Sequence, residues 1–327
     1  MNMEKKHFSK LGLMFFVGTI VIYALQYGVI GIVEAVAPQL LESNDISLLI
    51  SMLPVYLISY PIMIACIKKV PAVQETEKKK MSVGQWLVAF IMCYSLVYIS
   101  NIIGNIVTSI VGVLKQGQVE NTIVNVAMSV SPLANFLFMV IAAPIMEEYI
   151  FRKLLIDRTV KYGEGLSILL SGVIFGLFHG NLNQFAYAFF LGCFFAFIYV
   201  RTRNVLHTIL MHMLNNFMGS ILGMFILEKS GFLEFSEAML TASPEELTAL
   251  MMNNLSGLAI YFIYVMVLLI MVFAGVILLI LKRKKFYVNH TEEELPKGQR
   301  FKTVALNTGM LLFSAFWIVQ IITQLFE

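Results

Sequence analysis

Charged residues are scarce in this sequence. Of its 327 residues only 13% are Asp, Glu, Lys or Arg, whereas an average soluble domain carries about 25%. Hydrophobic residues make up 59% of the chain and the mean hydropathy is +0.82, so we place the chain in a lipid bilayer. The formal net charge is only +3, and this balance gives no sign of a nucleic-acid partner.

Cysteine is scarce as well. Cys66, Cys93 and Cys193 all fall within apolar segments and show neither a paired nor a metal-like spacing, so we interpret them as small core residues. The sequence has no G-x-S-x-G motif, which removes the usual support for a serine nucleophile. It has no internal repeat either, although transporters built from inverted halves usually show one.

Long apolar runs, in contrast, fill the chain. A helix needs about 20 mostly apolar residues to cross a bilayer, and we predict an all-α fold, a polytopic transmembrane helical bundle of about eight or nine spans, with the active site buried among the central helices. The third stretch contains Asn101, Gly104 and Asn105 and is expected to be tilted or broken there. The short fifth and sixth are expected to be partial spans. The nine stretches are Leu11–Ala37, Ile46–Ile67, Val83–Leu114, Pro132–Ile156, Leu166–Leu182, Gln184–Val200, Val205–Leu227, Leu255–Leu281 and Val304–Phe326.

Basic residues alternate with acidic ones along the loops. The basic residues precede the first stretch and follow the second, fourth, sixth and eighth, whereas the loop 228–254 is acidic. The positive-inside rule then predicts a cytoplasmic N-terminus, and we expect an integral protein of a bacterial plasma membrane. Within the acidic loop, Ser243 to Glu246 is typical of a capped helix start and predicts a short surface helix. We divide the chain into N-terminal transmembrane helices (1–130, about three spans), a catalytic core (131–222), and an outer loop with two C-terminal transmembrane helices (223–327).

Two adjacent acids inside the fourth stretch mark a candidate site. An ionised side chain near the bilayer centre costs roughly 2.5–3.5 kcal/mol, and such residues usually serve a pathway or a site. Glu148 and Arg152 are four residues apart, so they share a helix face and can pair. Glu147 points about 100° away and is free to face something else.

Two later stretches bring further polar groups to a similar depth. Counted at 1.5 Å per residue from the inner ends of their helices, Glu147 lies ~16 Å deep, His179 ~21 Å and His212 ~14 Å. Asn216 follows His212 by four residues on the same face. A buried carboxylate beside imidazoles can activate water, and His or Asn can donate hydrogen bonds to an oxyanion. Glu147, His179 and His212 are also a ligand set for catalytic zinc.

Each feature also has a structural interpretation. The Glu148–Arg152 pair taken alone is more often a structural intramembrane pair, and His212 taken alone is more often an interhelical hydrogen-bonding residue. Two other functions are compatible with the same residues. One is a non-catalytic immunity or scaffold protein, and the other is a proton-coupled transporter with an acid–histidine relay. The order of the features and their matching depth favour hydrolysis within the membrane.

At these residues the chain resembles the CPBP family, which groups type II CAAX prenyl endopeptidases with bacteriocin-processing and self-immunity (ABI) proteins. The family pattern is E-E-x-x-x-R, then F-x-x-x-H, then H-x-x-x-N. The three motifs correspond here to Glu147–Arg152, Phe175–His179 and His212–Asn216. The resemblance covers roughly Leu133–Ser220, and the flanking spans lie outside it.

The resemblance implies an intramembrane endopeptidase of helical-bundle fold. It implies that Glu147 and His179 activate the attacking water, that His212 and Asn216 form the oxyanion hole, and that Glu148 and Arg152 support them. The family is often labelled metalloprotease, but a metal-free glutamate mechanism also fits its motif. We favour the metal-free mechanism, with no cofactor required and zinc as the alternative, because no further carboxylate completes the outer shell of a zinc site. The expected partners are the lipid bilayer and a peptide or prenylated membrane-protein substrate. CAAX-type processing, peptide maturation and bacteriocin self-immunity all stay open, as does the oligomeric state.

Overall fold

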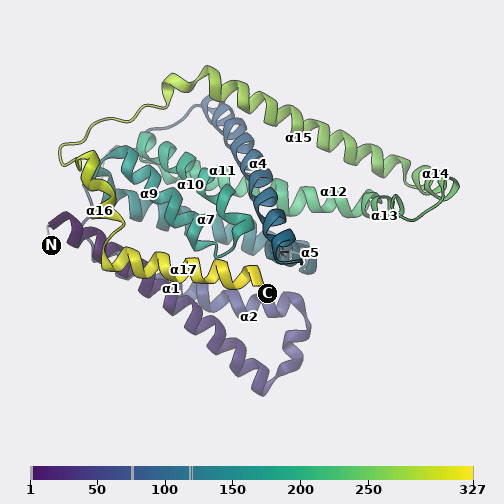
Figure 1. The fold of residues 1–327 in the computed structure, drawn as a ribbon, viewed down its shortest axis with the longest axis horizontal. Helices are drawn as coiled ribbons and strands as arrows, with labels where there is room; N and C mark the ends of the chain where they lie inside the picture. Colours follow the sequence, from purple (N-terminus) through teal and green to yellow (C-terminus); the bar gives the residue numbers. More distant parts are fainter. Residues whose placement is uncertain (1–2, 75–76, 118, 120, 327) are drawn as a thin grey trace.

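The protein is a bundle of long helices (Figure 1). A computed structural model describes residues 3–74, 77–117, 119 and 121–326, and within them every regular element is helical. The α-helices are α1 (Met3–Val36), α2 (Asn44–Pro54), α3 (Tyr60–Lys68), α4 (Val83–Leu114), α5 (Thr122–Ser129), α6 (Pro132–Asn135), α7 (Ala143–Glu148), α8 (Leu155–Thr159), α9 (Glu164–Phe178), α10 (Leu182–Thr202), α11 (Val205–Asn216), α12 (Met224–Lys229), α13 (Phe232–Ala238), α14 (Pro244–Asn253), α15 (Leu255–Leu281), α16 (Arg300–Val304) and α17 (Thr308–Phe326).

Short segments of other helix types join some of these elements without a break. The π-helical segments are η2 (Val55–Ser59), η3 (Phe136–Ala142), η4 (Tyr149–Leu154) and η6 (Phe217–Gly223). The 3₁₀ segments are η1 (Pro38–Glu42), η5 (Val160–Tyr162), η7 (Arg283–Lys285) and η8 (Lys297–Gln299). Single π-helical turns inside α-helices occur frequently at functional sites, and three of the four here adjoin α7 or α11.

Eight helices in the described part of the chain are long and apolar enough to cross a membrane. The chain is therefore an integral membrane protein, as its composition predicted. The ninth expected span is α9, which has 15 residues and reaches only ~22 Å, less than the roughly 30 Å of a bilayer core. This length agrees with the expected partial span. The same expectation is wrong for the sixth stretch, because α10, with 21 residues, is long enough to cross. The chain turns from α9 into α10 through Gly180, whose φ of +67° suits glycine.

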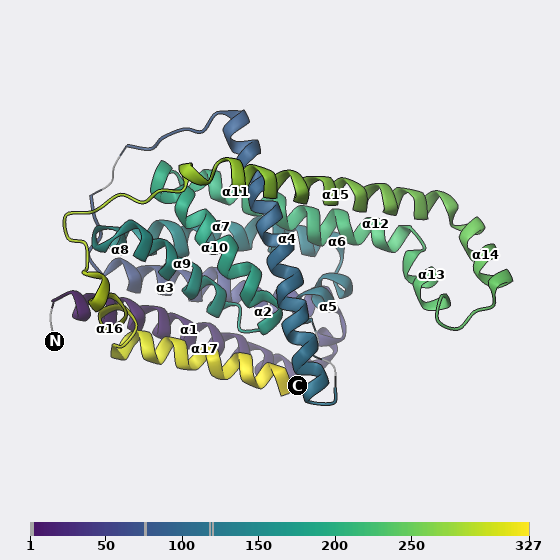
Figure 2. The ribbon, with the colours of Figure 1, turned by 45° about the horizontal axis from the view of Figure 1, so that its top comes forward.

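Of the two alternatives expected for the third stretch, a tilt or a break, the structure excludes the break, because α4 is continuous from Val83 to Leu114. The expected tilt is present, since α4 slants across the other helices (Figure 2). Asn105 donates a hydrogen bond to the side-chain oxygen of Asn101, so these two amides interact without interrupting the backbone. A Cβ atom at Gly104 would lie 2.9 Å from the carbonyl oxygen of Asn183. This glycine therefore lets α4 approach α10.

The helices α9 and α10 pack closely through small residues. A Cβ atom at Gly172 would overlap Sγ of Cys193, and one at Gly192 would lie 2.9 Å from Cα of Gly172. Small residues at such contacts allow membrane helices to approach at backbone distance. The α9–α10 pair is therefore a compact unit, and its connecting turn carries His179.

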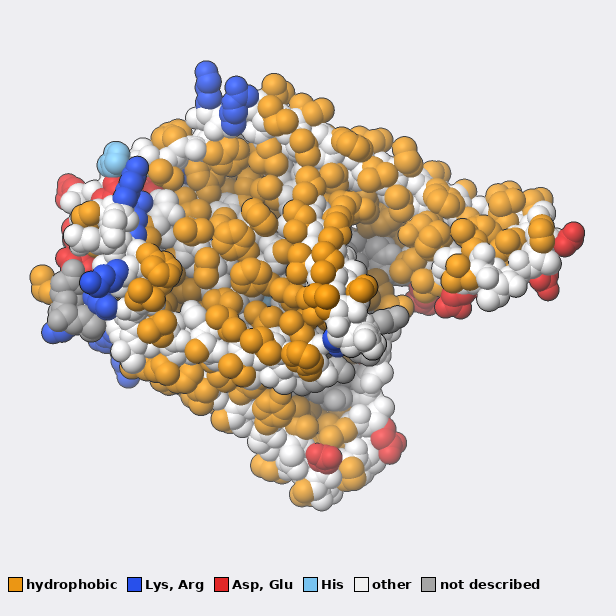
Figure 3. Space-filling model, viewed as in Figure 1, with side chains coloured by type: hydrophobic (Ala, Val, Ile, Leu, Met, Phe, Trp, Pro, Cys, Tyr) orange, Lys and Arg blue, Asp and Glu red, His pale blue; other side chains and the backbone are white. Residues whose placement is uncertain are grey.

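Charged side chains gather toward the ends of the molecule (Figure 3). Basic side chains gather where α1 begins and α15 ends, and acidic ones mark the tip formed by α13 and α14. The predicted surface helix is confirmed as α14, where Ser243 caps the N-terminus and Glu246 completes a capping box. The division into segments 1–130, 131–222 and 223–327 stays a prediction.

Candidate active site

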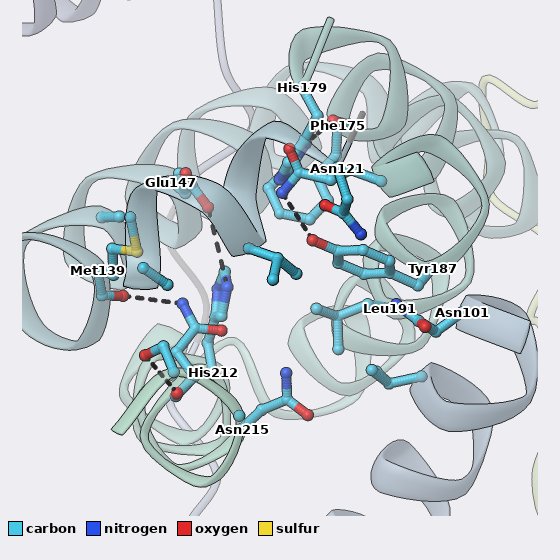
Figure 4. A pocket seen from close by; sticks show the side chains of 18 of the residues that line it. Asn101, Asn121, Met139, Glu147, Phe175, His179, Tyr187, Leu191, His212 and Asn215 are labelled. Carbon is cyan, nitrogen blue, oxygen red and sulfur yellow. Dashed lines mark hydrogen bonds and ion pairs between the residues drawn. The ribbon is translucent and has the colours of Figure 1, made fainter. Parts of the chain in front are cut away.

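A cavity of about 470 Å³ lies among α4, α5, α7, α9, α10 and α11 (Figure 4). Four of the six residues singled out in the sequence line it: Glu147, His179, His212 and Asn216. The other two, Glu148 and Arg152, lie behind the wall and are fully buried. The tertiary structure thus brings residues from three separate helical segments to one cavity.

Glu148 and Arg152 form a buried ion pair, as their spacing predicted. The Arg152 Nη2 group donates to Oε1 of Glu148 at 3.1 Å. Nε of Arg152 also lies 3.0 Å from Oε2, but without the alignment of a hydrogen bond. The pair forms although Arg152 lies in the π-helical segment η4. A buried charge needs such a partner, because removing one member of a buried pair costs about 3–5 kcal/mol.

Two further contacts hold the Arg152 guanidinium. Nη1 donates to the Ser171 hydroxyl at 3.1 Å, and this hydroxyl donates to the Phe151 carbonyl oxygen at 2.8 Å. The guanidinium carbon also lies 4.4 Å from the centre of the Phe175 ring, where a cation is attracted to the aromatic face. The sequence analysis missed Ser171; its only signal is a serine within the apolar run of α9.

His212 connects the buried pair to the cavity. Its Nδ1 lies 3.1 Å from Oε1 of Glu148, and its Nε2 lies 3.9 Å from Oε2 of Glu147. The Glu147 side chain is 16% exposed, whereas that of Glu148 is 0% exposed. This difference separates the two neighbouring acids, because only Glu147 is open to the cavity. Figure 4 shows the Glu147 carboxylate directed at the His212 ring.

His179 is held in one orientation at the end of α9. Its Nδ1 lies 2.8 Å from the Phe175 carbonyl oxygen. A carbonyl oxygen only accepts hydrogen bonds, so Nδ1 carries the proton. In the neutral ring Nε2 then has a lone pair. The Phe175 ring packs edge-on against the imidazole at 4.7 Å between centroids. The phenylalanine of the F-x-x-x-H motif thus orients the histidine through both its backbone and its ring.

Asn216 stabilises the helix that carries Glu147 through a hydrogen bond to its backbone. Its side-chain nitrogen donates to the Met139 carbonyl oxygen at 2.8 Å. That oxygen lacks the usual helical donors, because the Ala143 N–H bonds Phe138 instead and Pro144 has no N–H. Asn216 therefore supplies a hydrogen bond that the proline removes, and it keeps a second N–H. The sequence analysis did not foresee this bracing contact.

Other amide and hydroxyl groups on the cavity wall were not singled out as site residues. They are Asn101 of α4, Asn121, Gln184 and Tyr187 of α10, Asn215 of α11 and Ser220 of η6. Tyr187 accepts a hydrogen bond from Gln184 at 2.6 Å. The available signal was a polar residue in an apolar stretch, but this signal does not reveal which face of a helix borders a cavity.

The arrangement does not fit a bound metal ion. Among the residues that the structure describes, no three His, Cys, Asp or Glu side chains are grouped closely enough to ligate one. Glu147 and His212 approach each other, whereas the predicted third ligand, His179, does not join them in such a group. We therefore assign no residue a role in metal binding.

Comparison with known proteins identifies the proteins that this chain resembles. Residues 129–218 match the family model described as type II CAAX prenyl endopeptidase Rce1-like. This segment is similar to the Rce1-like family. The chain is also 30% identical over 164 residues to "Putative membrane peptidase YdiL" of Bacillus subtilis (strain 168). That match covers 47% of this chain and 64% of the relative, just under two thirds of its length. No solved structure matches the chain.

The Rce1-like segment contains the whole polar cluster between Glu147 and Asn216. It does not contain all of the cavity, because α4 and Asn121 lie outside the match and also line the wall. The family resemblance therefore accounts for the acids, histidines and Asn216. The shape of the cavity depends in part on helices outside the matched segment.

Proposed function

We propose that the chain is an intramembrane endopeptidase that hydrolyses a peptide bond in a membrane-embedded or membrane-anchored polypeptide. The observation that carries the proposal is the separation of two adjacent acids. Glu148 is buried against Arg152 and His212, whereas Glu147 faces the cavity with His179 and His212 around it. One carboxylate thus orders the site and its neighbour is available to a water molecule.

Glu147 and His179 would activate the attacking water. The Glu147 carboxylate takes a proton from the water as its oxygen attacks the carbonyl carbon of the substrate. His179 accepts the second hydrogen bond of this water through Nε2, because Nδ1 donates to Phe175. The proton on Glu147 then passes to the amide nitrogen as the C–N bond breaks, which leaves an amine and a carboxylic acid. The proposed reaction requires no metal.

His212 and Asn216 would stabilise the negative charge that develops on the carbonyl oxygen. Preorganised donors at this position are worth about 10²–10³-fold in rate each. The second N–H of Asn216 is the neutral donor. His212 donates from Nε2 only as the imidazolium, because its Nδ1–H already points at Glu148. The proposal therefore requires a protonated His212 next to an ionised Glu147.

The cavity favours an uncharged stretch of polypeptide as substrate. Its described lining combines apolar side chains with amides and the site residues, and it includes no Lys or Arg. Amides can pair with a peptide backbone, while Val97 and Leu191 offer apolar contacts. Prenylated CAAX-type proteins and maturing or toxic peptides all meet this description. We propose a bacterial plasma membrane as the location, with the basic end of the bundle in the cytoplasm.

The decisive experiment uses purified protein in lipid nanodiscs. A library of membrane-anchored and farnesylated peptides is incubated with the wild type, Glu147→Gln and His179→Ala, and products are identified by mass spectrometry. Glu34→Gln serves as the matched control, because Glu34 is an exposed acid at the far end of α1. Cleavage by the wild type and the control, but by neither site variant, supports the proposal.

Two other outcomes would favour the competing functions. A binding or immunity protein would cleave no peptide, and Glu147→Gln would keep the cellular phenotype of the wild type. A proton-coupled transporter would show proton-dependent flux across liposomes with no cleavage.

A further inference from the structure

A second hollow lies at the basic end of the bundle, away from the candidate active site. It has a volume of about 610 Å³ and lies between the beginning of α4, the end of α10 and the segment that follows α15. We propose that this hollow binds an anionic phospholipid, with the phosphate on its rim and an acyl chain along its floor. We call it the basic groove, with a rim formed by Lys79, Lys80, Lys282 and Lys285.

The rim offers positive charge that the protein itself does not neutralise. Among the ion pairs of the described residues, none involves any of these four lysines. Arg201 also lines the groove but is already engaged. It pairs with Glu164 at 3.2 Å and stacks over the Tyr287 ring at 4.3 Å. The lysines are therefore the cations available to an external anion.

The floor is apolar and extends from headgroup level into the membrane. It includes Val88 and Met92 of α4 with Phe194 and Ile198 of α10. From Gly84 to Met92 the helix rises ~12 Å, so the floor continues well below the lysines. Phe286 closes one side, with its ring 6.2 Å from that of Phe194. A hollow that is basic above and apolar below matches a phospholipid end to end.

Charge complementarity selects the anionic lipid. Basic pockets between transmembrane helices on the cytoplasmic side bind anionic headgroups, and the groove lies at the basic end of α4, α10 and α15 (Figure 3). Free phosphate would satisfy the rim but leave the apolar floor uncovered. A zwitterionic lipid would cover the floor but bring a second cation to the lysines. An anionic phospholipid satisfies both parts.

The experiment titrates purified full-length protein in detergent with defined lipids and counts bound lipids by native mass spectrometry. We expect phosphatidylglycerol to bind at least tenfold more tightly than phosphatidylcholine. The variant Lys79→Gln/Lys282→Gln should weaken phosphatidylglycerol binding at least fivefold. The matched control is Lys78→Gln/Lys284→Gln, which removes the same charge from neighbouring lysines that do not line the groove. It should stay within twofold of the wild type.

A third variant tests the upper part of the groove, at the level of Gly84. Nothing lies within 4 Å of a Cβ atom placed at Gly84, so Gly84→Phe begins in open space and places its ring in the groove. It should reduce phosphatidylglycerol binding. Unchanged lipid binding in this variant would show that the lipid does not pass Gly84 and would overturn the placement of its acyl chain below.

Three results would overturn the proposal as a whole. One is equal affinity for the two lipids, and another is an equal loss of binding in the control and groove variants. The third is displacement of the lipid by inorganic phosphate at the same concentration, which would show a simple anion site. All of these readouts are independent of peptidase activity, so a failure of the proposed function leaves this inference testable.

Discussion

Nδ1 of His212 lies 3.1 Å from Oε1 of Glu148, a carboxylate whose charge Arg152 already balances. Because an ionised carboxylate only accepts hydrogen bonds, this contact places a proton on Nδ1. The opposite ring nitrogen, Nε2, is directed at Glu147 from 3.9 Å. Two residues adjacent in sequence thus face opposite edges of one imidazole, and five predictions concern this arrangement and its supports.

Replacing Glu147 with Gln should lower kcat by about 10²–10⁴-fold, the usual contribution of a general base. KM should change little, because glutamine keeps the size and polarity of the side chain. The measurement is steady-state cleavage of a peptide substrate in nanodiscs, with Glu34→Gln as the control. A drop of less than tenfold would show that another group takes the proton from water.

Replacing His212 with Gln should lower the rate without abolishing it, because the side-chain amide keeps a neutral N–H donor for the developing oxyanion. The measurement is steady-state cleavage of the same peptide substrate in nanodiscs, with Glu34→Gln as the control. Complete inactivity of the His212→Gln variant would indicate that His212 acts as a base instead.

Breaking the buried ion pair should lower the free energy of unfolding of the protein. Arg152→Met and Glu148→Gln should each cost about 3–5 kcal/mol, since each leaves one charge buried without its partner. The double variant should be more stable than the sum of the two losses predicts. Thermal unfolding in detergent measures the stability of the two single variants and the double variant. Strictly additive losses of stability would contradict a direct interaction between Glu148 and Arg152.

Asn216 should contribute separately to stability and to catalysis. Asn216→Ala leaves the Met139 carbonyl oxygen without a donor, which costs about 1–3 kcal/mol. Adding Pro144→Ala restores a backbone N–H at the position that lacks one, so this double variant should recover stability. Its activity should stay low if Asn216 also donates to the oxyanion. Recovery of both properties would show that Asn216 is only a brace.

Chelators should leave cleavage unchanged if water is activated by Glu147 without a metal. The test incubates active protein with a strong zinc chelator and compares the rate before and after dialysis. Metal content per chain is measured on the same sample. Loss of activity that added zinc restores would assign Glu147, His179 and His212 to a metal site and replace the proposed mechanism.

The helical architecture could be predicted from the sequence because apolar length and loop charge are local properties. Eight of the nine expected spans are long helices, and the capping pattern at Ser243 correctly predicted α14. The Glu148–Arg152 pair was also accessible, since a spacing of four residues sets neighbours on one helix face. The convergence of Glu147, His179 and His212 followed from depth along their helices.

Rotation and close approach between helices were decided only by the tertiary structure. Depth alone does not show which ring nitrogen of His212 meets which acid, because that depends on how α11 packs against α7. The bond from Asn216 to Met139 depends on a carbonyl oxygen freed by Pro144 in another segment. The close approach of α4 to α10 likewise depends on the room that Gly104 leaves beside the Asn183 carbonyl oxygen. The sequence by itself determined the spans and the chemistry of the polar groups, whereas contacts between distant segments decided the partner of each group.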